Sequence, residues 1–317
     1  MRPLLMVMVG TIVLGGLSLW RNHPPVENSM RLEIKQNPRT LVIFYGNQRG
    51  GNLTWASMKK HLLGPLGNAV DVAVLFKSTP SFPTPRYDWS RTVVTPPSNV
   101  TWGRICELKY QRSPWGIIGL MFGNGLCSDH RGTGGKLLLH RWRAQVGISA
   151  LKEEYDYYIF TRTDYLYLRD HFDVHALKKD VNCLYGDEWG GVNDKHIVIR
   201  GREKAIRALN ITQDILFNPH LWYELIKTHR ISNLEQLIKN YLDKEGIEFD
   251  KIPPTMITVR KIPEDSGETW STGIAIAPFS FYGLHVKMPT ELESVKSFFP
   301  SINISQELLI FNRTSDA

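Results

Sequence analysis

The sequence predicts an α/β protein in which helices cover the faces of a mostly parallel sheet. Apolar runs rich in β-branched and aromatic residues occur at 41–45 and 70–76, and a helix-permissive segment, 55–63, separates them. This is the rhythm of a β-α-β unit. Neither run alternates with polar residues, as expected for strands that are buried on both faces. With 42% hydrophobic and 22% charged residues, the chain has an ordinary globular composition.

The N-terminal segment 4–20 is uncharged and predicts a transmembrane signal-anchor, with residues 1–3 as a cytosolic tip. As a helix it would reach roughly 25 Å, which is enough for a thin membrane. Trp20 and Arg21 follow where an interfacial aromatic ring and a cation are expected. The alternative is a cleaved signal peptide, because 16–18 offers small residues to a signal peptidase.

Glycosylation sequons favour a lumenal location for the rest of the chain. Chance alone would give roughly two Asn-x-Ser/Thr triplets, but the sequence has more, at Asn52, Asn99, Asn210, Asn303 and Asn312. An anchor followed by a lumenal body gives a type II protein of the Golgi or endoplasmic reticulum membrane. Cleavage of the segment would give a secreted protein instead.

The remaining chain divides into a stem at 21–38, one folded domain at 39–300 and a tail at 301–317. The stem is rich in Pro and Asn. The net charge of +7 comes without a block of Lys or Arg, so we expect no nucleic-acid partner. Three cysteines are too few for a disulfide scaffold, although two could pair in an oxidising lumen: Cys106, Cys127 and Cys183.

Several further elements are expected along the domain. A strand is expected at 156–161, and a helix precedes it at 138–151. The apolar face of that helix would carry Leu138, Leu139, Trp142, Val146, Ala150 and Leu151, with Arg141, Arg143, Lys152 and Glu153 opposite. The remaining expectations are a short strand at 92–95, a helix with a capping box at 233–245, and strands at 255–262 and 273–281.

Arg162 and Asp164 come directly after the strand at 156–161. Ligands of open α/β sheets bind outside the carboxyl ends of strands, so both side chains are candidates for a site. Asp164 suits a divalent cation, Mn²⁺ or Mg²⁺, that bridges two phosphates. Arg162 could bind a phosphate through its planar fork or hold the carboxylate in place. The alternative is a purely structural ion pair.

The stretch 186–195 combines acidic, amide and aromatic residues with glycines. Gly190 and Gly191 would let the backbone approach a ligand closely, and a Trp between them and Glu188 offers a face to a sugar ring. Asp194 or Glu188 could serve as the general base toward an acceptor hydroxyl. The alternative is a surface turn with solvated acids.

Two weaker candidates complete the set. Arg49 follows the first strand in Asn47-Gln48-Arg49 and could contact a nucleotide base or phosphate, or could lie in an ordinary loop. His285 could be a distant metal ligand, although a lone histidine is more often an ordinary core or surface residue.

Two motifs together resemble those of a known family. They are Tyr155-Asp156 followed by a strand and Arg162-Thr163-Asp164, and then Gly190-Gly191-Val192-Asn193-Asp194-Lys195. A helix opening with Asn233-Leu234-Glu235 is a further similarity. This succession resembles the poorly characterised glycosyltransferase-like proteins of plants, algae and bacteria, which include bacterial lipopolysaccharide-synthesis proteins. The resemblance covers roughly residues 40 to 262 and is strongest from 136 to 200.

The resemblance implies a GT-A fold, a Rossmann-like sheet that binds a nucleotide sugar. It makes Asp164 the metal and diphosphate residue and Asp194 a contact of the donor sugar or the acceptor. The chain departs from the family pattern at Phe160, where the family often has Arg, and at Lys195, where Arg is usual. The expected donor-binding set is Arg49, Arg162, Asp164, Gly190, Gly191, Asn193 and Lys195.

The function expected on this basis is transfer of a hexose or similar sugar from a nucleotide-diphosphate donor to a hydroxyl of a glycan or glycoprotein. The alternative is a lumenal carbohydrate-binding or scaffold protein of the same fold that does not catalyse transfer.

Overall fold

The structure, a computed structural model, describes residues 38–46, 50–76, 82–95, 134–186, 188–231, 233–261, 284–287 and 289–304. The strands are β1 (Thr40–Tyr45), β2 (Val70–Val74), β3 (Tyr87–Asp88), β4 (Tyr157–Arg162), β5 (Tyr165–Tyr167), β6 (Val181–Leu184), β7 (His196–Arg200), β8 (Phe249–Ile252), β9 (Met256–Lys261) and β10 (Leu284–Val286). The α-helices are α1 (Gly51–Met58), α2 (Gly64–Leu66), α5 (Gly134–Ala150), α6 (Arg202–Leu209), α7 (Ile211–Phe217), α8 (Pro219–Thr228), α9 (Leu234–Lys244) and α10 (Pro289–Phe298).

A seven-stranded sheet in the order β3-β2-β1-β4-β7-β6-β8 forms the centre of the fold. All of its strand pairs are parallel except those of β7, which runs antiparallel to both β4 and β6. The expected α/β class with a mostly parallel, helix-flanked sheet is therefore confirmed.

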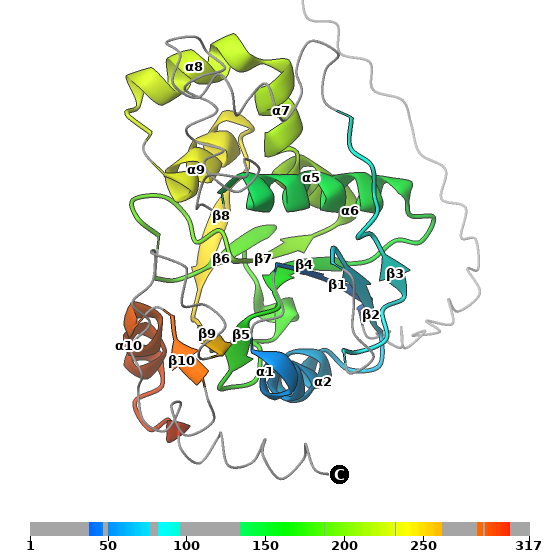
Figure 1. The fold of residues 1–317 in the computed structure, drawn as a ribbon, viewed down its shortest axis with the longest axis vertical. Helices are drawn as coiled ribbons and strands as arrows, with labels where there is room; N and C mark the ends of the chain where they lie inside the picture. The colour runs from blue at the N-terminus through cyan, green and yellow to red at the C-terminus, as the bar shows by residue number, and fades with distance from the viewer. Residues whose placement is uncertain are drawn as a thin grey trace, which may run out of the picture. The chain divides into compact units, whose positions relative to one another are not determined.

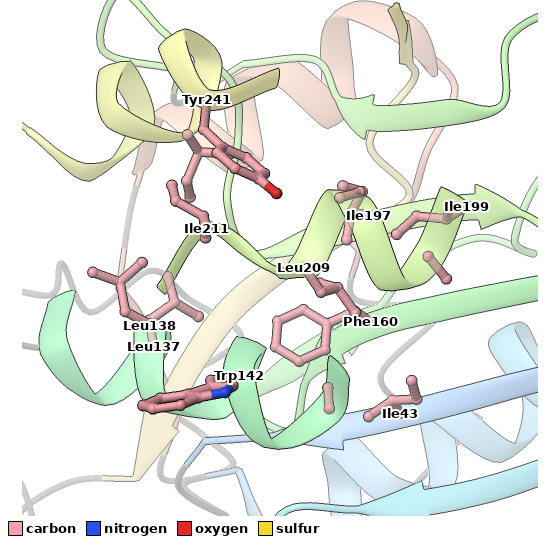
Figure 2. Close-up of a cluster of buried hydrophobic side chains, with 14 of the residues drawn as sticks. Ile43, Leu137, Leu138, Trp142, Phe160, Ile197, Ile199, Leu209, Ile211 and Tyr241 are labelled. Carbon is pink, nitrogen blue, oxygen red and sulfur yellow. The ribbon is translucent and has the colours of Figure 1, made fainter. Parts of the chain in front are cut away.

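Helices cover both faces of this sheet (Figure 1). Along β1, Leu41 and Ile43 point into one apolar cluster, and Val42 and Phe44 point into another on the opposite face. The first cluster contains side chains of α5, α6, α7, α8 and α9, and Figure 2 shows part of it. The second contains side chains of α1. Burial on both faces explains why β1 is apolar throughout.

A smaller sheet, in the order β10-β9-β5, lies beside the large one, and α10 packs on one of its faces. Glu291 links α10 to this small sheet. Its carboxylate accepts hydrogen bonds from the backbone N–H of Thr258 in β9 at 2.6 Å and from the Thr258 hydroxyl at 3.0 Å. Because β5 begins three residues after the end of β4, this small sheet adjoins the carboxyl end of β4.

The structure corrects two local expectations. The segment 92–95 is irregular, and the strand of this region is β3. The helix α5 was expected to expose Arg141, but this residue is fully buried. Its guanidinium carbon lies 5.4 Å from the centroid of the Phe160 ring, and this contact lets a cation enter the apolar side of the helix.

Other expectations either hold or fall outside the described residues. Asn233 caps α9, because its Oδ1 accepts a hydrogen bond from the Gln236 backbone N–H at 2.8 Å, and Gly246 ends the helix region with φ +63°. The expected strand at 273–281 lies outside the described residues. So do the expected membrane span at 4–20 and most of the stem. Within the described ranges, no helix combines the length and hydropathy that a membrane crossing requires.

Candidate functional site

The carboxyl ends of β1 and β4 meet at one edge of the large sheet. The chain first extends the sheet from β1 to β2 and β3, and then places β4 on the other side of β1. The order of strands therefore reverses between β1 and β4, and in open α/β sheets ligands bind at such a switch point. Tyr45 and Arg162 are register partners at the end of these two strands. Asp194 and Lys195 reach the same edge because they directly precede the antiparallel β7.

Arg162 and Asp164 form a bidentate ion pair at this edge. Arg162 Nε donates to Asp164 Oδ1 at 2.7 Å, and Nη2 donates to Oδ2 at 2.5 Å. The Asp164 side chain is 2% exposed, whereas that of Arg162 is 17% exposed. Of the two groups, the guanidinium is the one that faces solvent and is available to a ligand. The buried Asp164 carboxylate fixes the orientation of the guanidinium plane.

The expected metal ligands do not fit a metal centre in this arrangement. Both oxygens of Asp164 bind Arg162, so a divalent cation there would stand beside a guanidinium. His285 is half-buried on β10, in register with Arg260 of β9. Within the described ranges, no three His, Cys, Asp or Glu side chains gather as a metal-binding group.

Asp194 is buried beside two arginines. Its backbone carbonyl accepts hydrogen bonds from Arg141 Nη2 at 3.0 Å and from the Tyr45 hydroxyl at 3.3 Å. Its Oδ1, however, has no hydrogen-bond partner among the described residues, and neither do Nε and Nη1 of Arg141. Buried polar atoms are nearly always paired, so unpaired acceptors and donors in one place are typical of a functional site.

The electrostatics of Asp194 suit proton transfer. Burial raises the pKa of Asp194 above its ordinary value, and the nearby charges of Arg141 and Arg162 oppose this shift. Glu235, on the first turn of α9, interacts with it. Loss of solvent contact, followed by repulsion from Asp194, raises the pKa of Glu235 to about 7. Two interacting carboxyl groups whose pKa values lie above the ordinary range are typical of sites that exchange protons near neutral pH.

The glycines of the turn before Asp194 pack against α9. A Cβ on Gly191 would lie 2.1 Å from the carbonyl carbon of Glu235, and Gly190 adopts φ +84°. The backbone N–H of Val192 donates to the Glu235 carbonyl at 3.2 Å. These contacts bring the turn and the start of α9 together, two segments that are both part of the family resemblance. Close packing on α9 and the positive φ account for glycine at these two positions.

The other candidates from the turn have partners of their own. Glu188 accepts a hydrogen bond from the Gly186 N–H at 3.2 Å and forms an ion pair with Lys251. Asn193 is buried and closes the loop, since its Nδ2 donates to the Gly186 carbonyl and its Oδ1 accepts from the Lys195 N–H, each at 3.0 Å. Lys195 Nζ donates to Glu291 at 3.0 Å. Of this group, Asp194 is the one that faces the Arg162 edge.

Some candidate positions carry no further information about the site. Arg49, Asn99, Asn312, Cys106 and Cys127 lie outside the described residues. Cys183 is a buried free thiol. Among the sequons, Asn52 and Asn303 are exposed, and Asn210 is half-buried with its side-chain oxygen enclosed.

Comparison with known proteins adds no assignment: no family model matches the chain, and no curated protein matches it either.

Sequence reasoning missed Arg141, Tyr45 and Glu235. A signal for Tyr45 exists, because it ends the first strand as Arg162 ends β4. Arg141 lies one helical turn after Leu137, a spacing that places both on the same face of α5. No local signal distinguishes Glu235 from any other first-turn glutamate.

Proposed function

We propose that the protein is a glycosyltransferase of the GT-A type that moves a sugar from a nucleotide-diphosphate donor to a hydroxyl of a glycan or glycoprotein. The observation that carries the proposal is the grouping of Arg162, Asp164, Asp194 and Arg141 at the β1–β4 switch point. The mostly parallel sheet with a single reversed strand and a small adjoining sheet is consistent with this fold.

In the proposed reaction the acceptor oxygen bonds to the anomeric carbon of the donor while the bond from that carbon to the diphosphate oxygen breaks. Arg162 stabilises the negative charge that develops on the leaving diphosphate, and Asp164 keeps its fork in orientation. Asp194 accepts the proton of the acceptor hydroxyl through its unpaired Oδ1.

Arg141 acts in this scheme through Asp194 rather than on the substrate. It is fully buried, donates to the Asp194 carbonyl, and its charge keeps the carboxylate from becoming too weak an acid. Arg162 offers the diphosphate hydrogen bonds and positive charge, part of which the paired Asp164 offsets. A Mn²⁺ or Mg²⁺ ion, if bound with a nucleotide, would supply further neutralisation of the phosphates.

The proposal is tested by measuring turnover of UDP-sugars and GDP-sugars through the release of the nucleoside diphosphate. Asp194→Asn should lower kcat by about 100-fold or more, the usual contribution of a general base, and leave nucleotide affinity unchanged. Glu188→Gln is the matched control, because its carboxylate is already bound to Lys251. An active Asp194→Asn variant would remove Asp194 from the mechanism, and loss of turnover in Glu188→Gln alone would reassign the base to Glu188.

A further inference from the structure

The loop between β6 and β7 presents aromatic side chains to solvent beside the candidate site. Trp189 is 61% exposed, Tyr185 is 48% exposed, and Phe298 at the end of α10 is 41% exposed. Tyr185 and Phe298 meet edge to face, with ring centroids 5.4 Å apart. Large exposed rings are costly to leave in water, and such surfaces commonly bind a ligand or partner.

The backbone holds Trp189 in this exposed position. Its φ of +45° is unusual for a residue with a side chain. Two side chains of the α9 start stabilise it: Asn233 Nδ2 donates to the Trp189 carbonyl at 2.9 Å, and Gln236 Nε2 donates to it at 3.2 Å. A backbone conformation that is uncommon yet supported by hydrogen bonds is typical of functional positions. The backbone that carries the indole is therefore held in place, which lowers the entropic cost of binding.

The loop follows a path from α10 to α9 and carries Tyr185 and Trp189. A Cβ on Gly186 would lie 2.8 Å from Ser294 of α10, and one on Gly190 would lie 3.1 Å from Gln236 of α9. Tyr185 stands at the α10 end of this path and Trp189 at the α9 end. The loop then continues to Asp194, the proposed base. Asp194 thus lies on the same loop as Tyr185 and Trp189.

Amides and side chains in ion pairs lie beside Tyr185 and Trp189. Lys251 Nζ lies 5.6 Å from the Tyr185 ring centroid and forms an ion pair with Glu188, so that the two charges neutralise each other. Past Trp189, a groove between α8 and α9 begins at Gly190 and includes the amides of Gln236 and Asn240. Charged side chains line it as well: Lys239 and Asp243, which form an ion pair, Lys244, which pairs with Asp214, and Arg230. Sugar rings present C–H faces to aromatic rings and hydroxyls to amides and ion pairs.

We propose that Tyr185, Trp189 and Phe298 form a binding surface for a neutral oligosaccharide, the acceptor in the proposed transfer. A protein partner is less suited to this surface, because the ion pair of Lys251 and Glu188 lies beside Tyr185, so that charged groups adjoin the rings. The inference names the acceptor of the proposed reaction, and its test is binding, which does not need turnover.

The test is calorimetric titration of the full chain with four oligosaccharides: cellohexaose, xylohexaose, mannohexaose and galactohexaose. Saturable binding of at least one hexaose is expected, and Trp189→Ala should weaken it by about tenfold. The control Phe217→Ala removes an exposed aromatic ring, 55% exposed, from α7 and should bind as the wild type does. Equal melting temperatures would show that both variants remain folded.

Three outcomes would overturn the inference: no binding of any hexaose, unchanged binding in Trp189→Ala, or equal loss in Phe217→Ala. Titration of the same samples with UDP and GDP separates this inference from the proposed function. Hexaose binding without nucleotide binding would support the surface and remove the transferase. Nucleotide binding without hexaose binding would remove the surface alone.

Discussion

The carboxyl group of Glu235 provides a test of the site's electrostatics that needs no substrate. Loss of solvent contact and the neighbouring Asp194 raise its pKa from 4.5 to about 7. Between these two pH values the folded state binds more protons than the unfolded state, so the free energy of unfolding falls as the pH rises from about 4.5 to about 7. Above that range the ionised group destabilises the fold by a constant amount.

The size of this effect follows from the shift. A difference of about 2.5 pKa units corresponds to about 3.4 kcal/mol at 1.36 kcal/mol per unit. Because Glu235 is only half-buried, solvent screening reduces this to about 1–2 kcal/mol. We therefore expect Glu235→Gln to be more stable than the wild type by about 1–2 kcal/mol at pH 8, and equally stable at pH 4.5.

The assay is urea unfolding followed by tryptophan fluorescence between pH 4.5 and 8, for wild type and variant in parallel. Differences between the two cancel the contributions of titrating groups that do not interact with Glu235, and they include the change at Asp194, which does. Glu203→Gln is the matched control, since Glu203 holds the same first-turn position in α6 but is exposed. It should lose about 0.5 kcal/mol at pH 8 through the helix dipole. If Glu235→Gln were less stable than wild type at pH 8, or if the stability difference between the two did not depend on pH, the raised pKa of Glu235 would be wrong.

Three further predictions concern the fold. Burial lowers the pKa of His171 from 6.5 to about 4, so its contribution of about 3 kcal/mol to stability should be lost as the pH falls through this range. Urea unfolding of His171→Asn should lack this loss. Gly191→Ala should cost about 2–3 kcal/mol by overpacking, whereas Gly64→Ala, at a helical position whose nearest atom would be 3.4 Å away, should leave stability unchanged or slightly raised; equal melting temperatures of the two variants would contradict this. In a eukaryotic secretory host, peptide mass spectrometry should find a glycan at exposed Asn303 but not at half-buried Asn210, and a glycan at Asn210 alone would be the opposite result.

The sequence predicts the central strands well for a physical reason. Strands β1 and β4 are covered on both faces, so nearly every residue must be apolar and the run is visible without context. Strand β3 has two residues and, among the described strands, pairs with β2 alone, so its pattern is too short to reveal it. The burial of Arg141 was equally hidden, because it depends on Phe160 and on the Asp194 carbonyl, which lie far away in the chain.

The candidate site was predicted only where position along a strand is informative. Arg162 and Asp164 follow a strand whose carboxyl end faces the ligand edge, and this follows from the sheet alone. The two possible bases could not be separated in the same way. Glu188 pairs with Lys251, 63 residues later, and the contact between Gly191 and Glu235 also joins distant segments. Such pairings are decided by the folded chain and leave no local pattern.

The proposal that a nucleoside diphosphate binds at the Arg162 edge is tested by calorimetric titration of the purified protein with UDP and GDP, each with and without manganese. We predict that a nucleoside diphosphate binds without added metal. Arg162→Met should weaken this binding by about tenfold or more, as expected for loss of a charge-assisted fork. Replacement of the exposed Arg91, Arg91→Met, should leave it unchanged. Binding that requires manganese and survives Arg162→Met, or no binding of either nucleotide, would contradict the proposal.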